Sequence, residues 1–150
     1  MEIKELTASL VNQKNNLTSL LNAALQKQKA LVNFDYAGLE DSITREEKAI
    51  AFITEGEKGR IKILSELYSR YSISNRTFKL SEFLENTRGL LDAKSQKQIA
   101  VTEKELKELI TRVSMVNQQN KFLIENSRAF IKETVSRILN ARRSLLDKKV

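Results

Sequence analysis

The chain has 150 residues, of which 41% are hydrophobic and 30% charged; it carries a formal net charge of +7 and has four glycines and no proline. This composition is typical of one folded, highly charged domain, here residues 1–150, and the absence of proline lets helices run long. Because there is no cysteine and no histidine, disulfides, thiolate chemistry and metal sites built from these residues are excluded.

Hydropathy along the chain bears on its location. No apolar run approaches the roughly 20 residues of a membrane span. The first ten residues, MEIKELTASL, carry early acidic groups and lack the apolar centre of a secretory signal. We therefore expect no membrane span and a cytoplasmic location.

A first helix is predicted over residues 2–32. Its apolar residues recur at three- and four-residue steps, which lays a stripe along one side of a helix. The stripe consists of Ile3, Leu6, Leu10, Leu17, Leu20, Leu21, Ala24, Leu25, Leu31 and Val32. Gln13 and Lys14 leave a gap in it. The segment NFDYAG (33–38) then breaks the pattern, and we expect Asn33 or Asp35 to cap the next helix.

A second helix is predicted over residues 36–71. Its stripe consists of Leu39, Ile43, Ile50, Ile53, Ile61, Leu64, Tyr68 and Tyr71. Gly56 and Gly59 weaken it, since each costs about 1 kcal/mol relative to alanine inside a helix. The pattern favours a continuous helix, and a kink or break at these glycines is the alternative.

A turn at SISNR (72–76), a short helix over 78–91 and a long helix over 93–147 complete the chain. The long helix would span about 80 Å at 1.5 Å per residue. Its heptad-like stripe predicts left-handed antiparallel packing at about 20°. The predicted fold is therefore all-α, an elongated antiparallel helical bundle or coiled coil of three long helices and one short one.

The side chains available argue against an enzyme. Without histidine there is no ordinary general base near neutral pH. The glycines do not form a phosphate-binding loop between a strand and a helix, and the paired carboxylates, such as Glu46 with Glu47, do not converge on one point. We expect no catalysis, no cofactor, no metal and no small-molecule substrate.

Charge is distributed unevenly. Residues 92–150 carry 13 basic and 7 acidic groups, whereas residues 33–72 carry 6 basic and 8 acidic groups. The densest basic cluster is Arg142, Arg143, Lys148 and Lys149. Cations near the C-terminus of a helix are favoured by the helix dipole alone, so a solvated face is the plainer interpretation and nucleic-acid binding is not expected.

Unequal helix lengths point to a surface for a partner. A helix of about 55 residues must extend beyond one of 31, and its segment from Phe122 to Leu145 is rich in large apolar groups. Such a surface suits an amphipathic helix of a partner. The candidate partner-binding residues are Leu123, Ile124, Phe130, Ile131, Val135, Ile138 and Leu145, with Arg142 and Arg143 as charges at the rim. The alternative is that the first helix covers this segment.

Two asparagines lie near the apolar stripe of the long helix. Asn117 and Asn120 are three residues apart and face inward or nearly so. A polar residue in such a seam lowers stability but fixes the register of the helices, because only one alignment satisfies its hydrogen bonds. In an antiparallel pair, Gln13 and Asn16 are candidate partners. A hydrated face is the alternative.

Several short patterns occur in a recognisable order. The segment LQKQKALVNFDYAGLEDSITREEKAIAFI contains a leucine, a polar break, a second leucine and a glutamate pair (Leu31, 33–35, Leu39, Glu46 and Glu47). Arg60 follows in the second helix, RTFKLSEFLE opens the short helix, and VNQQNKFLIENSRAFI carries Asn117, Asn120, Leu123 and Ile124. In order, spacing and total length, over about residues 3–140, these patterns resemble the FlgN family of flagellar type III export chaperones.

The resemblance implies a small cytoplasmic helical chaperone. Such a protein would bind the hook-associated proteins of the hook–filament junction, prevent their premature assembly and deliver them to the flagellar export apparatus. The C-terminal part of the family is associated with client binding, which agrees with the apolar segment described above. A structural coiled-coil protein that assembles with itself, without a client, is the main alternative, and a DNA-associated basic bundle is a third hypothesis.

Overall fold

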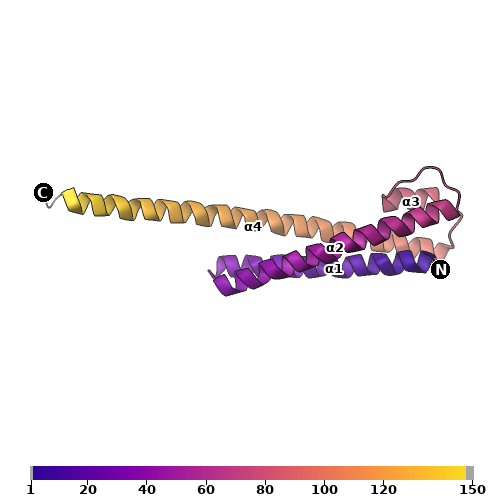
Figure 1. Cartoon of the computed structure of the whole chain (residues 1–150), viewed down its shortest axis with the longest axis horizontal. Coiled ribbons are helices and arrows are strands. Elements are labelled where there is room, and N and C mark those ends of the chain that lie inside the picture. The colour runs from indigo at the N-terminus through magenta and orange to yellow at the C-terminus, as the bar shows by residue number, and fades with distance from the viewer. Residues whose placement is uncertain (1, 148–150) are drawn as a thin grey trace.

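The computed structural model describes residues 2–147, which form four helices joined by turns and loops (Figure 1). The helices are α1 (Glu2–Val32), α2 (Tyr36–Arg70), α3 (Leu80–Asn86) and α4 (Ala93–Asp147). The all-α helical bundle expected from the sequence is confirmed.

Helix α1 packs against both of the other long helices. α2 folds back antiparallel to α1, whereas α4 runs parallel to α1 (Figure 1). An ion pair between Lys14 and Glu105, and a contact of Ala24 with Asn120 further along both helices, show this direction. The expectation that the first and last helices pair antiparallel is wrong, because the chain reverses twice between them.

The turn between α1 and α2 is closed by Asp35. Its Oδ1 accepts a hydrogen bond of 3.0 Å from the backbone N–H of Gly38, which satisfies a free donor at the start of α2. The preceding Phe34 has a φ of 53°. Of the two predicted caps, Asp35 is therefore the one that acts on α2.

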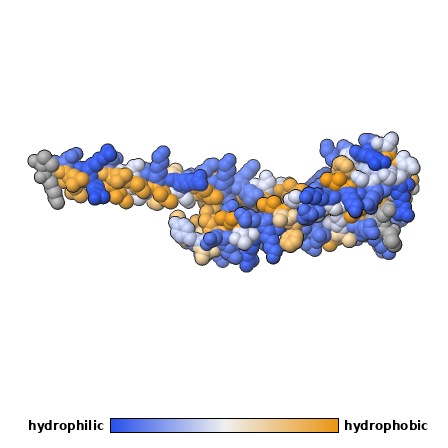
Figure 2. Space-filling model, in the orientation of Figure 1, coloured by the Kyte–Doolittle hydropathy of each residue, from blue (hydrophilic) through white to orange (hydrophobic). Residues whose placement is uncertain are grey.

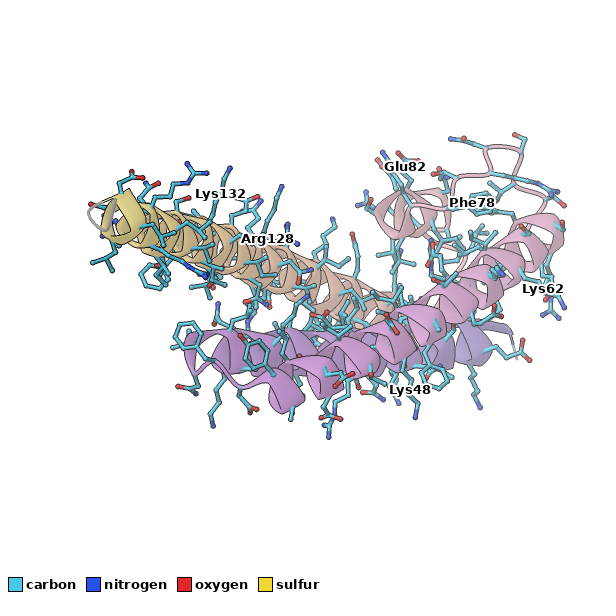
Figure 3. All side chains as sticks on the ribbon, turned by 60° about the vertical axis from the view of Figure 1, so that its left-hand side comes forward. Lys48, Lys62, Phe78, Glu82, Arg128 and Lys132 are labelled. Atoms are coloured by element: carbon cyan, nitrogen blue, oxygen red, sulfur yellow. The ribbon has the colours of Figure 1, made fainter. Side chains whose placement is uncertain are left out.

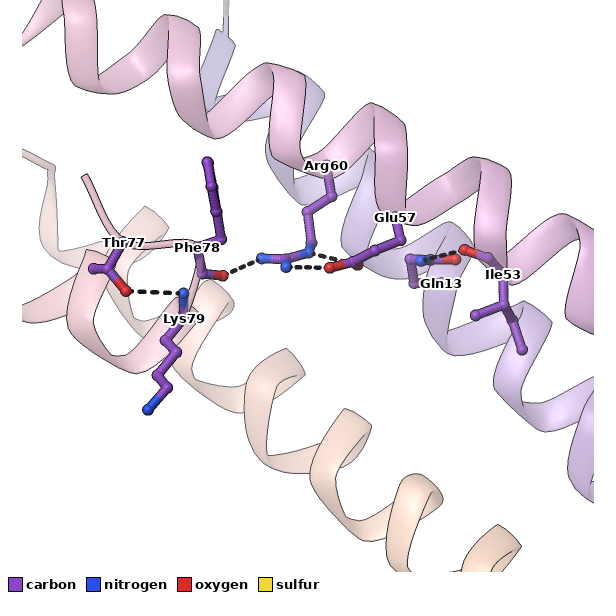
Figure 4. Close-up of polar contacts among 7 residues, drawn as sticks. All are labelled: Gln13, Ile53, Glu57, Arg60, Thr77, Phe78 and Lys79. Carbon is purple, nitrogen blue, oxygen red and sulfur yellow. Dashed lines mark hydrogen bonds and ion pairs between the residues drawn. The ribbon is translucent and has the colours of Figure 1, made fainter.

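Helix α2 is continuous through both glycines, as predicted. At Gly56 an added Cβ would lie 2.3 Å from Oε1 of the buried Gln13. The Nε2 of Gln13 donates a hydrogen bond of 3.1 Å to the carbonyl of Ile53 (Figure 4). Gln13, which interrupts the apolar stripe of α1, therefore contacts α2 at Gly56. The absence of a side chain at Gly56 leaves room for the buried amide of Gln13.

The two glycines of α2 give a matched test of this contact. Gly59→Ala is expected to raise the free energy of unfolding by about 0.5–1 kcal/mol, because nothing lies within 4 Å of its added Cβ and alanine favours the helix. Gly56→Ala should instead lower it by about 1 kcal/mol, since Gln13 must move and its hydrogen bond is lost. Urea denaturation followed by circular dichroism measures both, and equal stabilisation by the two variants would contradict the contact.

Helix α3 is shorter than the predicted 78–91 and spans only Leu80–Asn86. Arg60 of α2 donates a hydrogen bond of 2.7 Å to the carbonyl of Phe78, which holds this residue in the loop before α3 (Figure 4). Beyond the other end, Gly89 has a φ of 85°, which a helix does not allow. The contact with Arg60 therefore keeps residues 78–79 out of α3, and the backbone geometry at Gly89 keeps its C-terminal end from extending to residue 91.

Two clusters of buried residues form the core, one at the end of the bundle that holds α3 and one midway along α1 and α4. The first consists of Leu6, Leu10, Leu64, Leu67, Tyr68, Leu80, Phe83 and Ile99. The second consists of Leu21, Ala24, Val113 and Val116. Within the described residues no buried residue of α4 lies beyond Asn120.

Candidate protein-binding surface

The last part of α4 projects beyond the rest of the bundle (Figure 1). We call residues 128–147 the overhang. Every residue of the overhang is exposed. α1 ends at Val32, where the chain turns back into α2, so neither helix covers it.

The overhang carries an apolar stripe. Ile131, Ile138 and Leu145 are 55%, 61% and 64% exposed. Phe130 and Val135 are also exposed, and Figure 2 shows hydrophobic residues running along this projecting end of the molecule. Because aliphatic side chains at helical spacing are normally buried, and a contiguous exposed patch marks an interaction site, the stripe is the prime candidate surface.

The other predicted site residues lie at the two ends of this stripe. Leu123 and Ile124 are half-buried where α4 leaves the bundle. Arg142 and Arg143 are exposed near the end of α4. The structure thus places all nine predicted partner-binding residues on one helix, from the edge of the bundle to the end of the overhang.

A groove opens where α4 separates from α1 and α2, and we call it the branch groove. Its lining combines apolar and polar residues: Leu20, Lys27, Glu46, Ile50, Asn117, Asn120, Lys121, Ile124, Glu125 and Arg128. It continues into an apolar groove between α2 and α4 that contains Ile50 and Ile110. Ile50 belongs to the predicted stripe of the second helix, yet both isoleucines are about half exposed, because α2 and α4 do not close over α1.

The two asparagines of α4 differ in their surroundings. Asn120 is buried, and its Nδ2 donates a hydrogen bond of 2.9 Å to the carbonyl of Ala24. Asn117 is exposed and lines the branch groove. The expected pairing with Gln13 and Asn16 is wrong. The Nδ2 of Asn16 donates a hydrogen bond to Oε1 of Gln13, and the Nε2 of Gln13 donates one to the carbonyl of Ile53 in α2. Parallel packing places these two residues far from Asn120 along the bundle.

A half-buried ion pair lies in the branch groove. Nζ of Lys27 is 3.2 Å from Oε2 of Glu46. The second carboxylate oxygen of Glu46 and Oδ1 of Asn120 are buried and have no hydrogen-bond partner among the described residues. Sequence reasoning missed this groove, because Lys27, Glu46 and Asn120 come together only through the packing of three helices. The glutamate pair was its one visible signal.

Positive charge surrounds the apolar stripe. The overhang carries five basic residues (Arg128, Lys132, Arg137, Arg142 and Arg143) and two acidic ones (Glu133 and Asp147). Figure 3 labels Arg128 and Lys132 on this part of α4. Nη2 of Arg137 lies 2.7 Å from Oε1 of Glu133, so one acid is already paired within the helix. An acidic partner would therefore meet mostly unneutralised cations.

Shifted pKa values occur in the body of the bundle. A hydrogen bond from Arg60 lowers the pKa of Glu57, and burial raises the pKa of the Tyr68 hydroxyl. Glu57 is paired with Arg60 of the same helix, and the ring of Tyr68 packs edge-to-face against Phe83 of α3. Among residues 2–147 no three His, Cys, Asp or Glu side chains are grouped to hold a metal, and no helix is long and apolar enough to cross a membrane.

Comparison with known proteins identifies the family. A protein-family model described as FlgN protein matches residues 1–145. The chain belongs to the FlgN family. This is a family of flagellar export chaperones and not of enzymes, so the chain has a chaperone role in flagellum biogenesis. Searches of curated proteins and of solved structures give no match.

The FlgN-like patterns of the sequence lie at helix contacts. Glu46 forms an ion pair with Lys27 of α1, and Arg60 donates a hydrogen bond to the carbonyl of Phe78 in the loop before α3. Asn120 donates a hydrogen bond to the carbonyl of Ala24 in α1. Each pattern therefore contributes to the shape of the bundle from which the overhang projects.

Proposed function

We propose that this FlgN family chaperone binds the hook-associated proteins of the hook–filament junction through amphipathic helical segments at their ends. The overhang holds the segment until export, which prevents premature assembly, and the complex is delivered in the cytoplasm to the flagellar export apparatus. The exposed apolar stripe of the overhang, which begins at the half-buried Leu123 and Ile124, is the observation that carries this proposal.

The stripe has the dimensions for one client helix. The 20 exposed residues of the overhang extend about 30 Å, or between five and six helical turns. Burying apolar surface there is favourable by about 25 cal/mol per Å², from which the ordering of the client segment must be subtracted. Binding of this kind needs no nucleotide, metal or other cofactor.

An aspartate pair in the stripe tests the site. Ile131→Asp/Ile138→Asp is expected to abolish pull-down of hook-associated proteins, because two charges would be buried against the client. Its far-ultraviolet circular dichroism should stay that of the parent, since both side chains are exposed. Ala129→Asp/Ser136→Asp is the matched control, with the same added charge on the opposite face of the overhang, and it should bind normally. Unchanged pull-down by the isoleucine variant would contradict the assignment of the stripe as the client-binding site.

Sedimentation separates this function from a structural coiled coil. A chain that binds hook-associated proteins as a one-to-one complex agrees with a chaperone. A stable oligomer of the chain alone, with no affinity for the ends of hook-associated proteins, would instead favour self-assembly through the same stripe.

A further inference from the structure

The stripe on α4 follows a seven-residue repeat. Ile124, Ile131, Ile138 and Leu145 are spaced by seven, and the first lies where α4 leaves the bundle. A straight α-helix falls short of this repeat by about 20° per seven residues. A second helix that follows the stripe would therefore wind around α4 in a left-handed coil.

The charged residues that flank such a seam are all basic, and the other flanking positions hold Leu123, Phe130, Val135 and Ser144. One edge of the stripe contains Lys121, Arg128 and Arg142, and the other contains Arg137. All four side chains are exposed. The acids of this segment, Glu125, Glu133 and Asp147, lie on positions farther from the seam. Flanking charges select the partner of a coiled coil, and here none of them is acidic.

We propose that the overhang selects a partner helix with acidic residues on both edges of its apolar stripe. This inference rests on the proposed function and narrows its clients by chemistry. Between the large residues of the repeat lie the small Ser127, Thr134 and Ala141. The partner helix therefore supplies large aliphatic side chains opposite them, also at seven-residue spacing.

A second copy of the chain fits this surface poorly. In a parallel pair, Arg137 of one copy would face Arg142 of the other. In an antiparallel pair, the edges that carry Arg128 and Arg142 would face each other. Like charges at these positions oppose pairing. The basic edges thus disfavour self-assembly and favour an acidic helix.

Two designed peptides of 28 residues test the inference with the full-length chain. Both carry leucine and isoleucine in the seam; one has glutamate and the other lysine at all flanking positions, so each repels itself equally. Fluorescence anisotropy should show that the glutamate peptide binds at least about tenfold more tightly than the lysine peptide. Its affinity should fall as salt is raised from about 50 to 500 mM.

Charge reversal supplies the decisive comparison. Arg128→Glu/Arg142→Glu should reverse the preference and select the lysine peptide. Lys132→Glu/Arg143→Glu, with the same change in net charge off the flanking positions, should retain the preference for glutamate. Equal binding of the two peptides, or the same outcome for both double variants, would overturn the inference.

Two further outcomes separate this inference from the function on which it rests. Hook-associated proteins that bind the parent and the Arg128→Glu/Arg142→Glu variant equally would overturn charge selection and leave the client assignment standing. Displacement of the glutamate peptide by a DNA duplex, with Ile131→Asp/Ile138→Asp still binding the duplex, would show a general anion site and overturn the inference.

Discussion

Replacing Phe83 by alanine is expected to lower the free energy of unfolding by about 3–5 kcal/mol. Phe83 is fully buried and lies edge-to-face against Tyr68 of α2, with ring centroids 5.6 Å apart. Its helix has only seven residues and cannot persist by its own hydrogen bonds. Loss of the ring therefore removes the main attachment of α3 and opens the core cluster beside Ile99.

Urea denaturation followed by circular dichroism gives the size of this effect. Phe52→Ala is the control, because Phe52 is 55% exposed on α2 and its removal should change stability by about 0.5 kcal/mol or less. If both variants lost the same stability, Phe83 would not be the anchor of α3. Client binding by Phe83→Ala should persist wherever the bundle remains folded, since Phe83 lies at the end opposite the overhang.

The sequence predicted the long helices closely, and physical reasons explain why. α1, α2 and α4 end within one residue of the predicted bounds, because proline is absent and their apolar stripes are long. The short helix was predicted poorly. Its start depends on the bond from Arg60 to the carbonyl of Phe78, which the local sequence does not reveal.

The candidate surface was visible in the sequence, but its surroundings were not. Unequal helix lengths pointed to an uncovered stripe on the last helix, with its coverage by the first helix as the alternative. An apolar stripe, however, has the same spacing whichever way its neighbour runs, so the parallel packing of α1 and α4 could not be derived from it. Consequently the predicted partners of Asn120 were wrong, and its bond to a backbone carbonyl has no sequence signature.

The hydrogen bond from Asn120 to the carbonyl of Ala24 is the kind of contact that fixes the register of two helices. A one-turn slip of α4 along α1 would remove its bond to Ala24 and bury both its amide groups without partners. The same slip would move the start of the overhang by about 5 Å. We propose that this buried amide fixes where the binding stripe begins, whereas the exposed Asn117 contributes to the branch groove.

Removal of the overhang separates folding from binding. A chain ending at Ser127 is expected to keep its cooperative unfolding transition, with a midpoint lowered by no more than about 4 °C. Residues 128–147 are all exposed and neither core cluster includes them, so their loss leaves the buried contacts intact. Affinity for hook-associated proteins should nevertheless be lost, because the chain would retain only Leu123 and Ile124 of the apolar binding residues.

A graded series makes the comparison sharper. A chain ending at Asn140 keeps Ile131 and Ile138 but loses Leu145 and both terminal arginines, so its affinity should fall between those of the full chain and the chain ending at Ser127. Titration calorimetry against the end segment of a hook-associated protein measures all three. Full affinity in the shortest chain would move the binding site to the branch groove around Ile50 and Ile124, where apolar surface remains open after the overhang is removed. Loss of cooperative unfolding in that chain would show instead that the overhang supports the bundle itself.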